Sequence, residues 1–275
     1  MYCLGRSPLS FPVFESGPVV NSATMAHLDG FHYGLVNPVL AYAIASIGAA
    51  LGLRCTVRAL DLPSKDRLGW LLLAASAIGC GIWTMHFIAM LGFTVTGSTI
   101  VYDVPVTIAS LLLAIVVVGI GVVHVGYRPR GLPTLLVGGT LMGVGVAVMH
   151  YLGMAAMQVQ GSVSYHPLLV LASVVIAVAA STTALWMTLN VRGLIAALGS
   201  ALVAGVAVVA MHYTAMAAVT VHLDGRAVTG GLPASQFILP LAVGVAVFLT
   251  AGAIIVTMSP TETARASGPE PELIP

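Results

Sequence analysis

Three short segments of the sequence place a histidine between methionines at the same spacing. They read MHFIAM at residues 85–90, MHYLGM at 149–154 and MHYTAM at 211–216. Side chains four residues apart lie on one face of an α-helix, so each histidine shares a face with the methionine that ends its segment. These stacked pairs are His86 with Met90, His150 with Met154, and His212 with Met216. The leading methionines, which flank the same face less directly, are Met85, Met149 and Met211.

Imidazole nitrogens and thioether sulfurs together form a soft to borderline ligand set. Soft ligands favour Cu(I), and imidazole suits copper, iron, nickel and zinc. No cysteine or glutamate stands in the three segments, which disfavours zinc and di-iron sites. Copper is therefore the expected metal, and haem is the alternative because His/His and His/Met pairs hold haem iron. Three histidines and three stacked methionines exceed what one copper ion takes, so some of the methionines are expected to be neighbours rather than ligands.

The segments belong to an internal repeat. Their histidines stand at positions 86, 150 and 212, so the interval between one copy and the next is nearly constant. A glycine lies seven residues before each histidine, at Gly79, Gly143 and Gly205. Similarity at such a fixed period indicates a repeated structural unit.

These three segments resemble the MHYT family of bacterial integral-membrane sensor domains, over roughly residues 31–258. One departure is visible, because Phe87 replaces the tyrosine of the first copy. The resemblance implies a sensor of oxygen, carbon monoxide or nitric oxide that acts through bound copper. Members of the family are often fused to cytoplasmic signalling domains. Only a short proline-rich stretch follows Met258 here, so we expect the membrane module alone, with a separate cytoplasmic signalling protein as its partner.

The composition is that of a membrane protein. Of the 275 residues 59% are hydrophobic and 7% are charged, whereas a soluble globular domain has about 25% charged residues. The net charge of +1 and the lack of a basic patch argue against nucleic acid as a partner. The sequence contains no Walker loop, G-x-S-x-G elbow, paired helical carboxylates or dinucleotide fingerprint, so we expect no enzyme activity.

Seven apolar runs are long enough to span a bilayer, which takes about 20 residues. They are continuous rather than alternating, which excludes a β-barrel. The expected fold is an all-α membrane protein with seven transmembrane helices. Their approximate ranges are residues 36–58, 69–93, 104–125, 134–158, 168–190, 194–220 and 236–258.

The odd-numbered runs repeat as well. Tyr33-Gly34, Tyr102-Asp103 and Tyr165-His166 precede the first, third and fifth runs. We therefore expect three pseudo-repeated helix pairs, related by an axis along the membrane normal, plus one additional helix. Small residues let helices approach closely in lipid. Those on the motif helices are Ala77, Gly81, Gly139, Gly143, Gly145, Ala201 and Gly205.

Basic residues set the expected orientation. One set of loops and helix ends carries eight of the ten, and the other side carries only Arg6 and Arg226. Because cytoplasmic loops are rich in Lys and Arg, the amino terminus is expected outside a bacterial cell membrane and the carboxyl terminus in the cytoplasm. The expected parts are an extracytoplasmic tail at 1–30, the membrane domain at 31–258 and a cytoplasmic tail at 259–275. Met25 is an alternative start of the chain.

In this topology the histidines share one depth. Each lies far along its run from the cytoplasmic start, at a distance of roughly 25 Å for a rise of about 1.5 Å per residue. In a core about 30 Å thick, this places all three near the outer face, where they can form a ring. Cys3, Cys55 and Cys80 fall at different depths, so neither a disulfide nor a cysteine metal site is expected.

An intramembrane histidine indicates a functional site by default. The preferred hypothesis is a sensor whose copper, near the outer face, meets a diatomic gas. The alternatives are a copper-handling protein, for transport or for cofactor insertion, and a haem-binding membrane protein. A purely structural alternative is interhelical hydrogen bonding by the imidazoles, at about 0.6 kcal/mol per bond. Tyr151 and Tyr213 are either hydrogen-bond donors that fix a histidine tautomer or residues of the interfacial aromatic belt.

Overall fold

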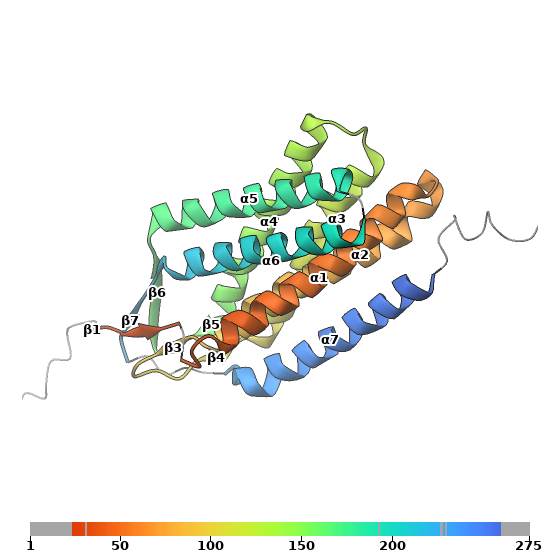
Figure 1. Cartoon of the computed structure of the whole chain (residues 1–275). Coiled ribbons are helices and arrows are strands. Elements are labelled where there is room, and N and C mark those ends of the chain that lie inside the picture. The colour runs from red at the N-terminus through yellow and green to blue at the C-terminus, as the bar shows by residue number, and fades with distance from the viewer. Residues whose placement is uncertain (1–23, 31, 192, 226–227, 229, 260–275) are drawn as a thin grey trace, which may run out of the picture.

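The computed structural model describes residues 24–30, 32–191, 193–225, 228 and 230–259. Seven long helices fill most of this part of the chain (Figure 1), and each is long and apolar enough to cross a membrane. The predicted seven-helix fold is confirmed, with helix ends within a few residues of the expected positions. The helices are α1 (Val36–Asp61), α2 (Arg67–Met90), α3 (Val104–Tyr127), α4 (Leu132–Ala156), α5 (Pro167–Asn190), α6 (Leu194–Met216) and α7 (Ala234–Met258).

The starts of the helices follow from local chemistry. Asp103 precedes α3, and its carboxylate accepts a hydrogen bond from the amide of Val106 at 2.9 Å, which satisfies one free donor of the first turn. A proline stands in the first turn of α3, α4 and α5, where its missing N–H costs nothing. Gly193 precedes α6 with a φ of +87°, a conformation that favours glycine in this short connection.

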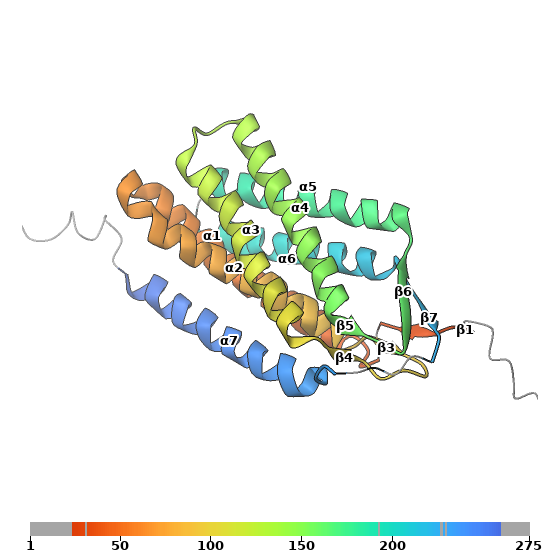
Figure 2. The same ribbon diagram turned by 180° about the vertical axis from the view of Figure 1, so that it is seen from behind.

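Six helices form a closed ring. Within the repeat units α1 packs on α2, α3 on α4, and α5 on α6. Between units α2 packs on α3, α4 on α5, and α6 back on α1. Helix α7 lies outside this ring, against α1 and α2 (Figure 2). The arrangement is the expected three helix pairs around one axis plus one additional helix.

The repeat glycines mark the contacts between units. A Cβ atom on Gly79 would meet the backbone of Ile115 in α3 at 2.8 Å. One on Gly143 would meet the backbone of Val178 in α5, and one on Gly205 would meet the Ser46 side chain in α1. Each glycine therefore lets its even-numbered helix approach the next odd-numbered helix around the ring, as small residues do in lipid.

Short strands lie at one end of the bundle, and these the sequence did not predict. Among the described residues, three antiparallel sheets have the orders β1-β7-β6, β2-β3 and β4-β5. Residues 24–29 pair with β7 and β3, so the folded unit includes residues assigned to the amino-terminal tail. The strands are β1 (Thr24–Met25), β2 (Leu28–Asp29), β3 (Thr94–Val95), β4 (Val101–Tyr102), β5 (Met157–Gln158), β6 (Gly161–Tyr165) and β7 (Val219–Leu223).

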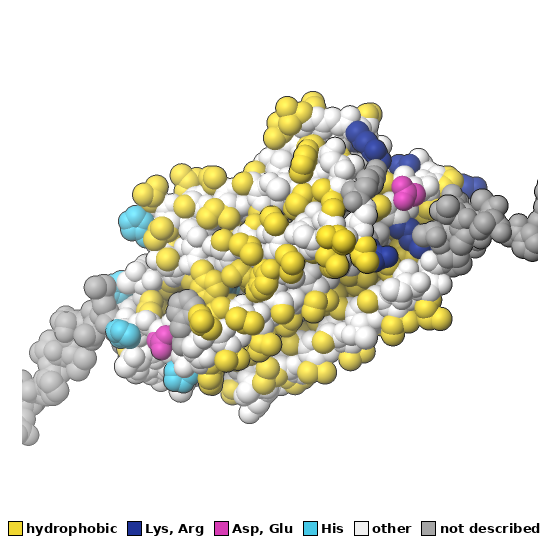
Figure 3. All heavy atoms as spheres, viewed as in Figure 1, with side chains coloured by type: hydrophobic (Ala, Val, Ile, Leu, Met, Phe, Trp, Pro, Cys, Tyr) yellow, Lys and Arg dark blue, Asp and Glu magenta, His cyan; other side chains and the backbone are white. Residues whose placement is uncertain are grey.

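The two ends of the bundle differ in charge (Figure 3). Basic side chains gather at the end that holds the α1–α2 and α3–α4 connections, and histidines stand at the strand end. Apolar side chains form the band between the two ends. The basic residues of the described chain are Arg54, Arg58, Lys65, Arg67, Arg128 and Arg130. Arg6, Arg192, Arg226 and Arg265, which also entered the orientation argument, lie outside the described residues.

Candidate metal centre

The three motif histidines lie on α2, α4 and α6, close to the strand end of the bundle. Each stands in the last two turns of its helix, which ends at Met90, Ala156 or Met216. At about 1.5 Å per residue they lie about 27–29 Å from the opposite end of the helices, in one layer. Because α2, α4 and α6 are arranged around a pseudo-threefold axis, histidines at a common depth form a ring.

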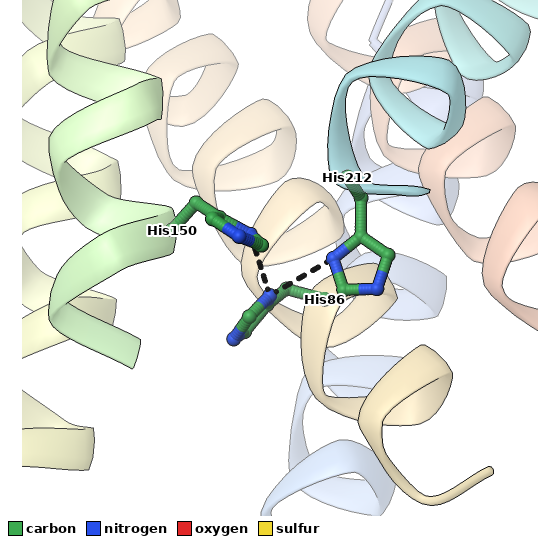
Figure 4. Close-up of side chains that lie close together, drawn as sticks. All are labelled: His86, His150 and His212. Atoms are coloured by element: carbon green, nitrogen blue, oxygen red, sulfur yellow. Dashed lines mark hydrogen bonds between the residues drawn. The ribbon is translucent and has the colours of Figure 1, made fainter. Parts of the chain in front are cut away.

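The imidazoles converge through their Nδ1 atoms (Figure 4). The Nδ1 atom of His86 lies 3.1 Å from that of His150 and 3.1 Å from that of His212. The ring centroids are 4.7–5.1 Å apart, and the planes are nearly perpendicular, at 76–80°. His86 is thus the central member of the cluster, since it makes both of the close nitrogen contacts.

Hydrogen bonding between the imidazoles cannot satisfy both close nitrogen contacts of His86. A neutral imidazole carries one N–H and one lone pair, so the Nδ1 atom of His86 either donates one hydrogen or offers one lone pair. It can therefore make a full hydrogen bond with only one of its two neighbours. The second close Nδ1–Nδ1 contact is then not a hydrogen bond. A cation between the three rings would accept a lone pair from each of them.

The burial of the cluster makes unpaired nitrogen atoms energetically costly. Each of the three histidines is 1% exposed. In the described part of the chain, the Nε2 atoms of His86 and His150 have no hydrogen-bond partner. A buried polar group without a partner costs on the order of 1–3 kcal/mol, so the two unpaired Nε2 atoms destabilise the cluster, and an ion bound at Nδ1 would not pair them.

The dimensions suit a metal ion. A metal–imidazole bond is about 2.0–2.1 Å long, so two nitrogens bound to one ion at tetrahedral or trigonal angles lie about 3.3–3.6 Å apart. The two 3.1 Å separations fall just short of this range. One ligand atom from each of the three histidines lies within 4.8 Å of the others. The residues present therefore fit a single ion held by three neutral imidazoles.

The six candidate methionines all belong to the core around the cluster. Met85, Met90, Met149, Met154 and Met211 are buried in the main hydrophobic core, and Met216 is half-buried against it. Their part as ligands stays a prediction, because burial alone is also what packing requires.

Gly153 is a contact of the cluster that sequence reasoning did not single out. A Cβ atom at this position of α4 would lie 2.6 Å from Nε2 of His86 and 3.0 Å from its Cδ2. The imidazole of His86 therefore rests against the bare backbone of α4. The equivalent residues of the other segments are Ala89 and Ala215. Comparing the fifth position of the three segments could have drawn attention to this glycine.

An aromatic layer surrounds the histidines. Phe87 packs on Tyr102 with ring centroids 5.7 Å apart, and Tyr151 packs on Tyr165 at 5.5 Å. The Tyr151 hydroxyl lies 2.9 Å from the Ser173 hydroxyl on α5. That contact links α4 to α5 and gives Tyr151 a partner other than a histidine.

The two tyrosines that precede α3 and α5 stay neutral. Burial raises the pKa of the Tyr102 hydroxyl above its ordinary value. The pKa of the Tyr165 hydroxyl is also raised, first by burial and then by the neighbouring Tyr151. Neither phenol therefore supplies a negative charge to balance a metal ion at this end of the bundle.

The other titratable candidates stand apart from the ring. Cys55 and Cys80 are free and buried in α1 and α2, and Cys3 lies outside the described residues. His124 lies in the last turn of α3, at the basic end. Four further histidines occupy the strand end, at His27, His32, His166 and His222.

Comparison with known proteins agrees with this architecture. The sequence profile of a family described as "MHYT: Bacterial signalling protein N terminal repeat" matches residues 79–138, 143–201 and 205–268. The three matches begin at Gly79, Gly143 and Gly205, the repeat glycines. Together they cover more than half of the chain.

Similar proteins are named as signalling proteins. The chain is 35% identical over 223 residues to the bifunctional diguanylate cyclase/cyclic di-GMP phosphodiesterase MucR of Pseudomonas aeruginosa, which covers 77% of this chain and 32% of MucR. It is 37% identical over 192 residues to the cyclic di-GMP phosphodiesterase NbdA of the same species, covering 67% of this chain and 24% of NbdA. An uncharacterized signaling protein of Caulobacter vibrioides is 32% identical over 75% of this chain and 25% of its own length. The chain thus spans a third or less of these relatives. No solved structure matches it.

Proposed function

The chain belongs to the MHYT family of bacterial signalling proteins, and from this we propose that it is a membrane sensor whose three motif histidines hold a copper ion that meets a diatomic gas. Oxygen, carbon monoxide and nitric oxide are the gases in question. The aligned part of the relatives is this membrane module, and we assign it a sensing role rather than a catalytic one.

One observation carries the metal proposal, namely that the buried Nδ1 atoms of His150 and His212 each lie 3.1 Å from the Nδ1 atom of His86. His86, His150 and His212 would be the ligands. The stacked methionines, Met90, Met154 and Met216, and the leading ones, Met85, Met149 and Met211, are the further donor candidates. When bound, the ion would supply an open coordination position to a small gas molecule.

Copper fits this site better than a dication such as zinc. All of the candidate donors are neutral, and each histidine is 1% exposed. Burying charge in an apolar interior is costly, and the cost rises with the charge of the ion. Cu(I) carries a single charge and accepts both imidazole and thioether ligands.

The geometry disfavours haem binding and copper transport. Haem needs a flat cavity between its axial ligands, whereas the three imidazoles here are within 5.1 Å of one another by ring centroids. A copper transporter needs a polar path through the membrane. The interior below the ring, on the side of the basic end, instead contains a cavity lined by apolar side chains and Ser181.

The bilayer and a signalling protein are the proposed partners. By the positive-inside rule the basic end faces the cytoplasm of a bacterial cell, with the histidine ring near the outer face. The signal would then pass along the helices to a cytoplasmic unit. Because MucR and NbdA are named for cyclic di-GMP turnover, an enzyme of that class is the partner that we propose.

Metal analysis of the purified protein tests the proposal. We expect about one copper per chain, with none in the triple variant His86→Ala, His150→Ala and His212→Ala. Single Met→Leu variants should differ among themselves, because Leu keeps the volume and removes the sulfur at a cost below about 1.5 kcal/mol. Metal loss in a folded Met→Leu variant identifies a ligand. Full copper content in the triple histidine variant would end the proposal.

A further inference from the structure

A small cavity lies inside the bundle next to the histidine ring. Its volume is about 40 Å³, and its walls come from α1, α2, α4, α5 and α6. One of its lining residues is Met211, the neighbour of His212 in sequence. The mechanism of metal binding described above makes no use of this space.

The cavity lies under the ring, on the faces that carry the histidines. Ile82, Val146 and Val208 line it, and each stands four residues before a histidine of the cluster. A second set of lining residues stands eight positions before the histidines, at Ile78, Met142 and Ala204. Residues at these spacings share a helix face. In all three repeats, the helix face that carries the histidine therefore also lines the cavity.

The chemistry of the walls excludes water and suits an apolar gas. Among the lining residues, all within the described chain, Ser181 alone has a polar side chain. A buried water needs two to four polar partners, and apolar cavities stay dry and take up xenon or benzene. Roughly 10–15 Å³ accommodates a single water-sized molecule, so about 40 Å³ has room for a molecule of two heavy atoms.

The other side of the ring is covered. The strands and their connections close the end of the bundle beyond the histidines, and the imidazoles are 1% exposed. An uncharged diatomic molecule dissolves in the hydrocarbon of the bilayer, unlike an ion. Its approach to the ring from the apolar interior therefore requires no opening of the strand end.

We propose that this cavity is a binding site for one diatomic gas molecule and that gas reaches the histidine cluster through it. The supply of gas to the metal rests on the proposed function. The affinity of the cavity for a small apolar particle does not, because it depends on the walls alone.

Xenon is the probe for the cavity in the metal-free protein. Crystals under xenon pressure, or xenon-129 exchange spectra in detergent, should show one bound atom between Ile82, Val146 and Val208. Val208→Phe should abolish the signal by filling the space. Val206→Phe is the matched control, because Val206 is on the same helix and is 57% exposed on the outer surface. Ala204→Val fills less of the cavity and serves if the larger change prevents folding.

The second measurement uses copper-loaded protein and carbon monoxide. In Val208→Phe the association rate should fall about tenfold or more, because access to a buried site limits it. Val206→Phe should leave it unchanged. Absence of xenon from the cavity of the folded protein, or an unchanged association rate in Val208→Phe, overturns the inference. A protein that binds xenon but no copper refutes the proposed function instead, so the two failures are distinguishable.

Discussion

At the scale of single residues, the histidine cluster is less symmetric than its sequence. His86 makes both close nitrogen contacts, and its ring lies against the backbone of Gly153. The corresponding positions in the other two segments are alanines, Ala89 and Ala215. Gly153 therefore provides the space that the central imidazole occupies.

Substitution of Gly153 by alanine should disturb the proposed metal site directly. The added methyl would lie 2.6 Å from Nε2 of His86, so the ring must shift, and its two Nδ1 contacts must change with it. Residues that orient ligands typically change metal affinity 10–100-fold, and we expect a loss of about tenfold or more, measured by copper titration.

Gly199→Ala is the control for this change. A Cβ at Gly199 of α6 would meet nothing within 4 Å, so alanine should keep copper binding and stabilise the helix by about 0.5–1 kcal/mol. Equal copper affinity in the Gly153 and Gly199 variants would show that His86 does not depend on its contact with α4.

The sequence predicted part of this site and missed the rest for a physical reason. Equal spacing and equal depth were enough to bring His86, His150 and His212 together. Which ring nitrogen faces inward depends on side-chain torsions and on neighbours such as Gly153, which no spacing encodes. The spacing of four and eight residues also held the signal for the cavity, in Val146 and Met142, but apolar residues in a membrane helix do not distinguish a wall from ordinary packing.

At the scale of elements, the repeat glycines decide how closely the helices approach. Gly143→Ala should destabilise the bundle, because its methyl would lie 2.5 Å from the Val178 backbone of α5. Backbone atoms cannot rotate out of the way as a side chain can. Overpacking of this kind costs about 1–3 kcal/mol, measured by thermal unfolding in detergent. Gly244→Ala, on α7 with nothing within 4 Å, is the matched control and should lose no stability. An unchanged melting temperature for Gly143→Ala would mean that α4 and α5 separate freely.

Helices were predictable from the sequence, and strands were not. A continuous apolar run of about 20 residues is a strong signal because the bilayer demands it. The strands are two to five residues long, too short to show a period, and β1 pairs with β7 across most of the chain. Their partners are set by the positions of the helix ends, which only the folded bundle defines.

At the scale of the whole molecule, the helix that closes the ring beside α6 is α1, and not α7, which follows α6 in the sequence. The third family repeat covers residues 205–268 and so joins α6 to α7. In space, however, Gly205 of α6 packs against Ser46 of α1, which closes the ring. Helix α7 then lies over α1 and α2, and α2 becomes the most enclosed helix, with 78% of its spanning window buried against 22% for α6.

The orientation of this molecule in the membrane is a prediction of its charge distribution. In the described chain every Lys and Arg lies toward the end where α2 and α4 begin, and the segment between α2 and α3 contains none. Because basic loops stay in the cytoplasm, alkaline phosphatase fused after Met258 should be inactive, and green fluorescent protein fused there should fluoresce. A phosphatase inserted after Gly97, in the segment between β3 and β4, should be active and is the paired control. The reverse pattern would place the histidine ring near the cytoplasmic face, where the proposed gas sensor would sample the cell interior instead of the outer leaflet.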